Sequence, residues 1–178
     1  TRELSARYKL SDSISFGTSA YRGSVSDVLN RSGSKGGYNE VLDIEQEGLE
    51  SSFIFSGDNQ RISLTNTLSK SSEGNGSPQL RRPEKQYGVN YNVKLNSNYI
   101  GLYGLNFNYR HVGKAEDWVG NFRKDVDSTD IMNLGFSKEL FGMEWALKGT
   151  NITNEYYQKP YGYNQVGRKF NLSLRSKY

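Results

Sequence analysis

The sequence contains no cysteine and a single histidine, His111. Structural and catalytic zinc sites use mainly thiolate and imidazole ligands, so no His/Cys metal cluster can form. An activated nucleophile would also lack its usual base, and no GxGxxG or GxxxxGK[ST] phosphate loop occurs. We therefore expect no catalytic residue, no metal site and no cofactor. His111 is interpreted as a solvated loop residue at a strand end.

Long hydrophobic runs are missing too. No stretch of about 18 apolar residues exists, which excludes a transmembrane helix, and the chain starts TRELS without Met or a signal peptide. A hydrophobic fraction of 34% and a mean hydropathy of −0.77 are low for a globule with a two-sided core. The net charge of +4 is spread along the chain, which argues against nucleic-acid binding. The 13% of aromatic residues nevertheless indicates an ordered chain.

What the sequence has in abundance is alternation with a period of two, the pattern of a β-strand with two different faces. Apolar or aromatic residues fill the odd positions of 87–95 and 103–109, and small or polar residues fill the even positions. The pattern predicts nine strands, which fall near 2–10, 13–30, 38–56, 62–68, 87–95, 103–109, 132–136, 143–147 and 170–174. The connections alternate in length: short turns fall near 11, 58, 97 and 141, and long loops near 31–37, 71–80, 111–126 and 152–166.

Short and long connections alternate in this way in bacterial outer-membrane barrels, which also carry a polar lumen, an apolar outer band and aromatic girdles. We therefore predict an all-β fold, an antiparallel transmembrane β-barrel in the bacterial outer membrane. The long loops would lie outside the cell and the final Tyr178 on the periplasmic side. The alternative is a soluble antiparallel sheet or sandwich, which also alternates but averages about 5–6 residues per strand.

Four stretches carry a resemblance to a known family. They are AYRGSVSDVL at 20–29, EGLE at 47–50, LRRP at 80–83, and NITNEYY with YGYNQVGR at 151–168. In this order they resemble the C-terminal half of the barrel of TonB-dependent outer-membrane receptors. The segments SDVL, LRRP and YGYNQVGR are most similar to the vitamin B12 (cobalamin) receptor branch, and several siderophore receptors share them.

The resemblance implies a barrel of about 22 strands with a plugged lumen. Residues 1–178 would be its C-terminal part, with about nine strands and without the N-terminal plug. The implied function is active import of a large scarce chelate, cobalamin or an iron siderophore, energised by the TonB complex through that missing plug. Outer-membrane lipid, lipopolysaccharide and the barrel-assembly machinery are further implied partners. The alternative is a self-contained small barrel (an adhesin, porin-like protein or enzyme), although nine is an odd number and single-chain bacterial barrels favour even ones.

Aromatic residues in the long loops are the ligand-contact candidates, because flat rings give contact area at little entropic cost. They are Trp118, Phe122, Tyr157, Tyr161 and Tyr163. The alternative for each is an interfacial girdle position. The cations Arg81 and Arg82, with Arg168, would hold anionic ligand groups or lipopolysaccharide phosphates, or pair with acidic loop neighbours.

Three further groups of residues stand out in the sequence. Five acidic residues cluster around the loop 111–126: Glu116, Asp117, Asp125, Asp127 and Asp130. Calcium favours such density, but the spacing fits no EF-hand-type loop and solvated charge is the preferred interpretation. Four asparagines would face the lumen in a structural role: Asn90, Asn92, Asn106 and Asn108. By resemblance, Phe170, Leu172, Leu174 and Tyr178 form the C-terminal signal for barrel assembly.

Overall fold

The computed structural model describes residues 1–31, 39–119 and 122–176. Eleven strands form: β1 (Arg2–Lys9), β2 (Ile14–Arg31), β3 (Asn39–Ser56), β4 (Gln60–Glu73), β5 (Lys85–Ser97), β6 (Gly101–Val112), β7 (Ala115–Val119), β8 (Phe122–Val126), β9 (Thr129–Leu140), β10 (Met143–Thr150) and β11 (Lys169–Ser176). Within these ranges, no helix is long and apolar enough to cross a membrane.

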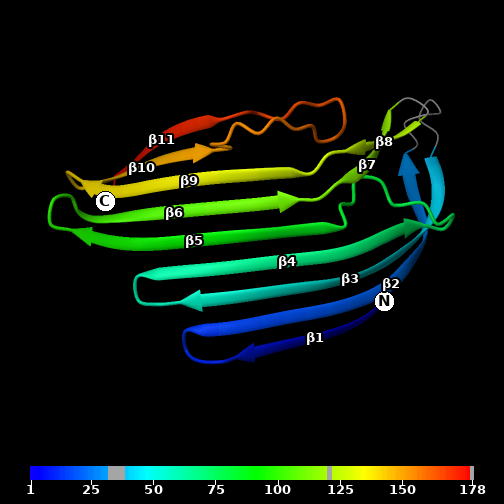
Figure 1. Cartoon of the computed structure of the whole chain (residues 1–178), viewed down its shortest axis with the longest axis horizontal. Coiled ribbons are helices and arrows are strands. Elements are labelled where there is room, and N and C mark those ends of the chain that lie inside the picture. Colours follow the sequence, from blue (N-terminus) through cyan, green and yellow to red (C-terminus); the bar gives the residue numbers. More distant parts are fainter. Residues whose placement is uncertain (32–38, 120–121, 177–178) are drawn as a thin grey trace.

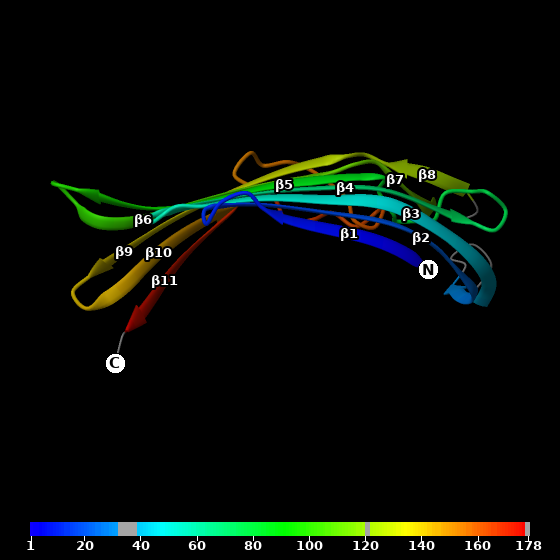
Figure 2. The ribbon, with the colours of Figure 1, turned by 90° about the horizontal axis from the view of Figure 1, so that it is seen from below.

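Nine of these strands form one antiparallel sheet in the order β1-β2-β3-β4-β5-β6-β9-β10-β11 (Figure 1). The predicted nine-stranded antiparallel arrangement is confirmed. Turned by 90°, the sheet is a single curved and twisted layer (Figure 2). The predicted long loop at 111–126 was wrong in part, because β7 and β8 pair within it as a separate two-stranded hairpin.

The short turns are made by local hydrogen bonds and by residues that accept a left-handed backbone. The Gly57 N–H donates to the Gln60 carbonyl at 2.8 Å, and the Leu10 N–H to the Ile14 carbonyl at 2.9 Å. Phe141 and Gly142 both have positive φ, at 54° and 70°. Two consecutive residues of this kind form the turn that best matches the twist of a hairpin. All four turns close strand pairs that are neighbours in the sheet.

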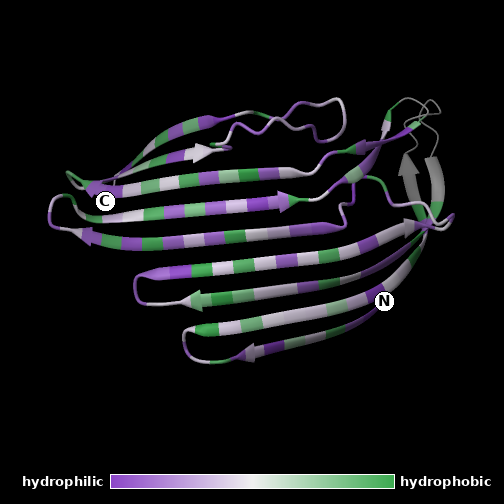
Figure 3. Cartoon of the chain, in the orientation of Figure 1, coloured by the Kyte–Doolittle hydropathy of each residue, from purple (hydrophilic) through white to green (hydrophobic). Residues whose placement is uncertain are grey.

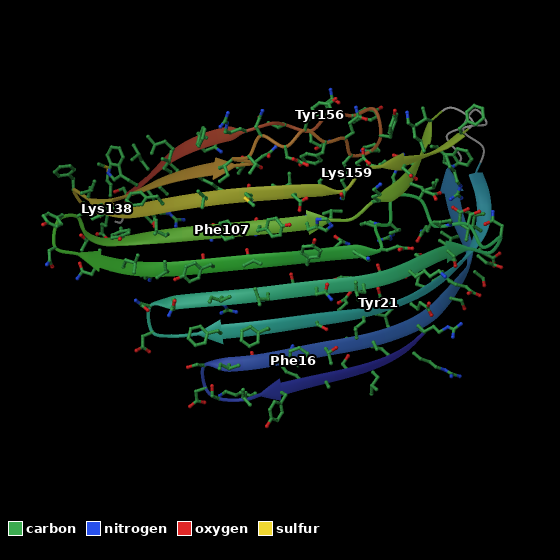
Figure 4. The ribbon with its side chains drawn as sticks, viewed as in Figure 1. Phe16, Tyr21, Phe107, Lys138, Tyr156 and Lys159 are labelled. Carbon is green, nitrogen blue, oxygen red and sulfur yellow. The ribbon has the colours of Figure 1, made fainter. Side chains whose placement is uncertain are left out.

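Hydrophobic and hydrophilic residues alternate along several strands (Figure 3), so the two faces of the sheet differ in chemistry, as the sequence pattern predicted. The register places Phe16 opposite Phe53, Phe53 opposite Leu64, Leu64 opposite Val89 and Val89 opposite Tyr109, so an apolar row crosses β2 to β6 on one face. Directly paired residues point to the same side of a sheet. We call this the apolar face. Figure 4 labels two of its residues, Phe16 on β2 and Phe107 on β6.

On the opposite, polar face the predicted asparagines form a ladder. Asn108 donates to Asn90 and Asn133 donates to Asn108, each at 2.7 Å, and Asn106 donates to Asn92 at 2.6 Å. The ladder therefore joins β5, β6 and β9 side by side. This confirms the expected shared face of the four residues and adds Asn133 to them.

Two aromatic rings cover glycines on a neighbouring strand. A Cβ built on Gly48 would lie 2.6 Å from the ring of its cross-strand partner Tyr21, and one built on Gly149 would lie 3.0 Å from the ring of Phe170. A cross-strand ring that covers a glycine helps to fix the register of a pair. The AYR and EGLE stretches thus meet at Tyr21 and Gly48, and β11 is fixed on β10 by Phe170.

We call the nine-stranded sheet the wall. Neither of its faces carries a second layer among the described residues. Ile44 and Val93 are the buried hydrophobic residues, whereas large apolar side chains stay exposed along the apolar face, Leu64, Leu105 and Leu147 among them. Exposed apolar surface on this scale marks a surface made for another apolar environment. Phe170, Leu172 and Leu174 lie exposed on β11, and Tyr178 lies outside the described residues.

Candidate functional site

Three of the long connections lie toward the end of the sheet that is opposite the short turns (Figure 1). The β7–β8 hairpin contacts the other two, which are residues 74–84 between β4 and β5 and residues 151–168 between β10 and β11. We call these three segments the loop cluster. Tyr156 and Lys159, labelled in Figure 4, lie on the last of them.

Asp117 on β7 joins the three segments. Its side chain is 1% exposed. One carboxylate oxygen accepts from Arg81 Nε and from the Trp118 N–H, both at 2.9 Å, and the other accepts from the Tyr161 N–H at 2.9 Å. A buried carboxylate is stable only when charge and hydrogen bonds compensate its lost hydration. Asp117 therefore fixes the positions of Arg81 and Tyr161, which belong to different loops.

Arg81 is held by its backbone as well as by its side chain. Its φ of 61° lies in the left-handed region, which is uncommon for a residue other than glycine. Its N–H donates to the Glu116 carbonyl at 2.8 Å, next to the ion pair with Asp117. The two interactions attach the LRRP segment to β7 and offset this backbone cost.

A second buried ion pair supports the hairpin from β4. Arg123 donates to Glu73 at 2.6 Å and to Glu116 at 3.1 Å, and Glu73 is 6% exposed. The guanidinium carbon of Arg123 also lies 5.6 Å from the ring centre of Trp118, within cation–π range. The hairpin is thus tied to the end of β4 and Trp118 is held against it.

The last loop contacts the hairpin through Tyr161. Lys124 donates to the Tyr161 hydroxyl at 2.6 Å, and its ammonium lies 4.7 Å from the centre of that ring. Within the loop, the Gln165 N–H donates to the Tyr157 carbonyl and the Lys159 N–H to the Tyr163 carbonyl, each at 3.0 Å. Tyr157 and Tyr163 therefore belong to one compact loop together with Tyr161.

Two asparagines build the start of this loop. Asn151 is 4% exposed and has a φ of 49°, and its side chain accepts from the Glu155 N–H at 2.8 Å and donates to the Glu155 carbonyl at 2.9 Å. Asn154 also has a positive φ, 57°, and accepts from the Arg168 N–H at 3.0 Å. Asparagine tolerates this backbone because its amide replaces lost backbone hydrogen bonds. The NITNEY segment is thus a folding element of the loop.

The structure brings some of the candidate ligand residues together and separates others. Arg81, Trp118 and Tyr161 converge on Asp117, with Trp118 and Tyr161 half-buried. Phe122 lies 77% exposed at the start of β8 and Tyr163 is 68% exposed in the last loop. Arg82 is exposed and lines a separate cavity of about 430 Å³ with Lys114 and Glu116.

Two interpretations made from the sequence were wrong. His111 is a residue of β6 with 16% of its side chain exposed, not a solvated loop residue: its ring stacks on Tyr87 with 4.3 Å between ring centres, and its Nδ1 lies 2.8 Å from Asp130. Asp117 is the second error, because it is buried rather than solvated. Within the described part of the chain, no group of three or more His, Cys, Asp or Glu side chains is arranged to hold a metal ion.

Sequence reasoning missed Glu73, Arg123 and Lys124. The hairpin register places Asp117 opposite Lys124 and Trp118 opposite Arg123. The signal was present as two five-residue segments, AEDWV and FRKDV, which place Asp117 opposite the cation Lys124. Glu73 gave no local signal, because its partner lies 50 residues away.

The arrangement presents exposed rings and cations on a scaffold whose own charges are paired. Phe122, Tyr163, Arg82 and Lys159 are exposed, whereas Asp117 and Glu73 are buried and bonded. Such a surface can contact a large ligand that has flat groups and negative charge.

No family model matches the sequence, and no curated protein matches it either. Solved structures do match the fold. The ferripyoverdine receptor of the outer membrane of Pseudomonas aeruginosa aligns with a TM-score of 0.81 at 12% identity, over 98% of this chain and 26% of that one. The ferric-catecholate import receptor Fiu from K12 E. coli aligns at 0.76 and 14%, over 98% and 27%.

The ferric preacinetobactin receptor BauA from Acinetobacter baumannii aligns with a TM-score of 0.70 at 19% identity, over 97% of this chain and 28% of that one. These neighbours are transport receptors and not enzymes. The chain spans about a quarter of the length of these receptors. Its fold is that of one part of the barrel wall of TonB-dependent outer-membrane receptors.

Proposed function

We propose that the protein containing this chain is an outer-membrane receptor that imports a large metal chelate with energy from the TonB complex. The observation that carries the proposal is the sheet itself, whose apolar face stays uncovered while its opposite face is polar and hydrogen-bonded. That division suits a wall between lipid and a wet lumen. The likeness to receptors for iron chelates supports it.

Within this proposal the loop cluster contacts the ligand from outside the cell. The exposed rings of Phe122 and Tyr163 supply contact area, and Arg81 and Arg82 supply positive charge. The half-buried side chains of Trp118, Tyr157 and Tyr161 complete the surface between these exposed groups. An anionic iron chelate fits these groups best, and cobalamin is the second candidate because of the sequence resemblance at the loop ends.

The test is uptake by cells that produce the full-length protein in an outer membrane lacking related receptors. Radioactive iron is supplied as catecholate and hydroxamate chelates, and labelled cobalamin is supplied in parallel. Energy-dependent uptake of one iron chelate supports the proposal. Uptake of cobalamin alone would replace the iron chelate by the second candidate, and uptake of none of them would contradict transport.

A self-contained small barrel remains the competing proposal. In the described sheet, the outer edges of β1 and β11 have no partner strand. An exposed strand edge inside a membrane leaves backbone groups unsatisfied, so a barrel has to close. The intact mass of the native polypeptide in outer membranes decides between them. A mass several times 20.2 kDa supports the receptor, and a mass near 20.2 kDa supports the small barrel.

A further inference from the structure

Four cations on β1, β2, β4 and β5 lie on the apolar face, between the apolar rows and the long loops. Arg2 lies opposite Arg22, Arg22 opposite Glu47, and Glu47 opposite Lys70. The next row toward the turns is Leu4, Ala20, Leu49 and Leu68, and Lys85 lies opposite Leu68. We call Arg2, Arg22, Lys70 and Lys85 the basic rim.

The basic rim lies on the side of the wall that would face lipid. Its side chains share their face with the pair Phe16 and Phe53, which lies six residues closer to the turns than the pair Arg22 and Glu47. A polar lumen or a bound chelate would be on the other side of the sheet. The cations therefore lie at the outer edge of the apolar rows, at the depth where lipid headgroups begin.

The charges of the basic rim are only partly compensated within the described residues. Arg2 and Arg22 are directly opposite each other, and like charges in this position destabilise a strand pair. The one ion pair is long: Arg22 Nε lies 4.0 Å from Glu47, and the Arg22 side chain is 79% exposed. Glu84 lines the same hollow, and Glu45 lies one row farther out, opposite Ser72. The four cations therefore outnumber the three carboxylates near them.

The surface is hollowed at this place. Arg22, Lys70 and Lys85 line a depression of about 580 Å³ together with the carboxylates Glu47 and Glu84 and the apolar side chains of Leu49 and Leu68. Arginine and lysine bind phosphate oxygens through charge-assisted hydrogen bonds. A molecule with a phosphate group above an acyl chain satisfies both parts of the depression, because the phosphate meets the cations and the chain covers the leucines.

The other half of the wall differs near its loop end, where the row of His111 and Asp130 continues through Tyr87 to Asn66, one row closer to the turns than Leu68 and Lys85. On β6 and β9 the corresponding polar groups are His111 and Asp130, which bond to each other at 2.8 Å. Because that pair is satisfied within the protein, it leaves no positive charge for an anion. The basic rim is thus a local feature of β1 to β5 and not a general property of the loop end.

We infer that the basic rim is a binding site for the phosphate headgroup of a membrane lipid, seated on the outside of the barrel. The inference rests on the part of the proposed function that places the wall in an outer membrane, and it does not depend on the transported ligand. It adds a lipid site on Arg2, Arg22, Lys70 and Lys85 that is separate from the loop cluster.

The test uses the full-length protein, extracted from outer membranes into a neutral detergent. Binding of diphosphoryl lipid A is measured by native mass spectrometry and by the rise in unfolding temperature. Each cation near an anionic lipid surface adds roughly a factor of five in affinity, so the double variant R22Q/K70Q should bind about thirtyfold more weakly. R61Q/K148Q is the matched control, because Arg61 and Lys148 lie on the polar face, opposite Asn92 and Asn171. It should bind as the unaltered protein does.

Three results would overturn the inference: equal binding by R22Q/K70Q and the unaltered protein, no binding by the unaltered protein, or equal stabilisation by inorganic phosphate at the same phosphate concentration. If R22Q/K70Q fails to fold, R2Q/K85Q removes two other cations of the same rim. Recovery of the protein from the outer membrane, with normal chelate uptake but no lipid binding, would refute this inference alone. Absence from the outer membrane would instead refute the proposed function.

Discussion

The wall and the loop cluster are stabilised in different ways. In the wall, large apolar side chains such as Leu64 and Leu105 are exposed, and the described residues bury little apolar surface. In the loop cluster, Asp117 and Glu73 are buried and each has an arginine partner. Under the proposed function the wall therefore depends on lipid outside and polar contents inside, whereas the loop cluster satisfies its own charges. A region of the first kind needs a membrane to be stable, and one of the second kind keeps its shape in water.

The largest expected effect is on the loop cluster, from Asp117→Ala. The Asp117 carboxylate accepts three hydrogen bonds at 2.9 Å, and a hydrogen bond to a charged group typically contributes about 1.5–3 kcal/mol. The loop 157–165 should lose its attachment to β7, and its amide hydrogens should exchange far faster, while those of β5 stay protected. Hydrogen exchange followed by mass spectrometry measures both regions at once.

Asp127→Ala is the matched control for that variant. Asp127 is 90% exposed and lies 4.0 Å from Lys114. Exposed pairs of this kind contribute about 0–1 kcal/mol. Equal loop exchange in the two variants would contradict the role of Asp117 as the residue that joins the loops.

The second prediction tests the wall through Leu105→Arg. Leu105 lies on the apolar face opposite Val93 and Phe136. A lipid-facing arginine near the membrane midplane costs about 2–4 kcal/mol. The folded fraction recovered from outer membranes, scored by its heat-sensitive migration in gels, should fall. Asn106→Arg, one residue along on the polar face, loses its hydrogen bond to Asn92, worth about 0.5–1.5 kcal/mol, and should lower that fraction less. Equal loss in both variants would contradict the assignment of the faces.

The third prediction concerns the asparagine ladder. Asn108 takes part in two hydrogen bonds, with Asn90 and with Asn133. Each bond is worth about 0.5–1.5 kcal/mol, so Asn108→Ala should destabilise the wall by roughly 1–3 kcal/mol. Thermal unfolding of the full-length protein in detergent measures the change. Ser63→Ala, which lies opposite Asn90 on β4, should have a smaller effect. An unaltered midpoint for Asn108→Ala would show that water replaces the ladder.

The smallest effect is expected at the exposed rings. Phe122→Ala removes a ring with little packing of its own and should weaken chelate binding about fivefold, the equivalent of roughly 1 kcal/mol for an aromatic contact. In this variant the amide hydrogens of the loop cluster should exchange as fast as in the unaltered protein. Trp118→Ala and Tyr161→Ala should change both binding and loop exchange, because these rings also pack under Arg123 and Lys124. Unchanged binding in all three variants would remove the loop cluster from the ligand site.

Much of the wall followed from the sequence because strand alternation is a local property. The period of two at 87–95 and 103–109 predicted which residues share a face, and the observed register agrees. The turn at Phe141 and Gly142 was likewise predicted from local residue types. The hairpin at 115–126 was missed, because its two strands are short and their stability depends on Arg81 and Glu73, which belong to other segments.

The sequence by itself determined the two-faced strands, the nine strands of the main sheet and the alternation of short and long connections. Side-chain direction along a strand depends only on neighbouring residues. Tertiary structure decided which charges are buried. Asp117 looked like one of five similar acidic residues, and only the approach of Arg81 and Tyr161 makes it the residue that joins three loops. Tertiary structure also decided that four cations spread from Arg2 to Lys85 form one rim, since strand pairing brings together residues that the chain keeps far apart.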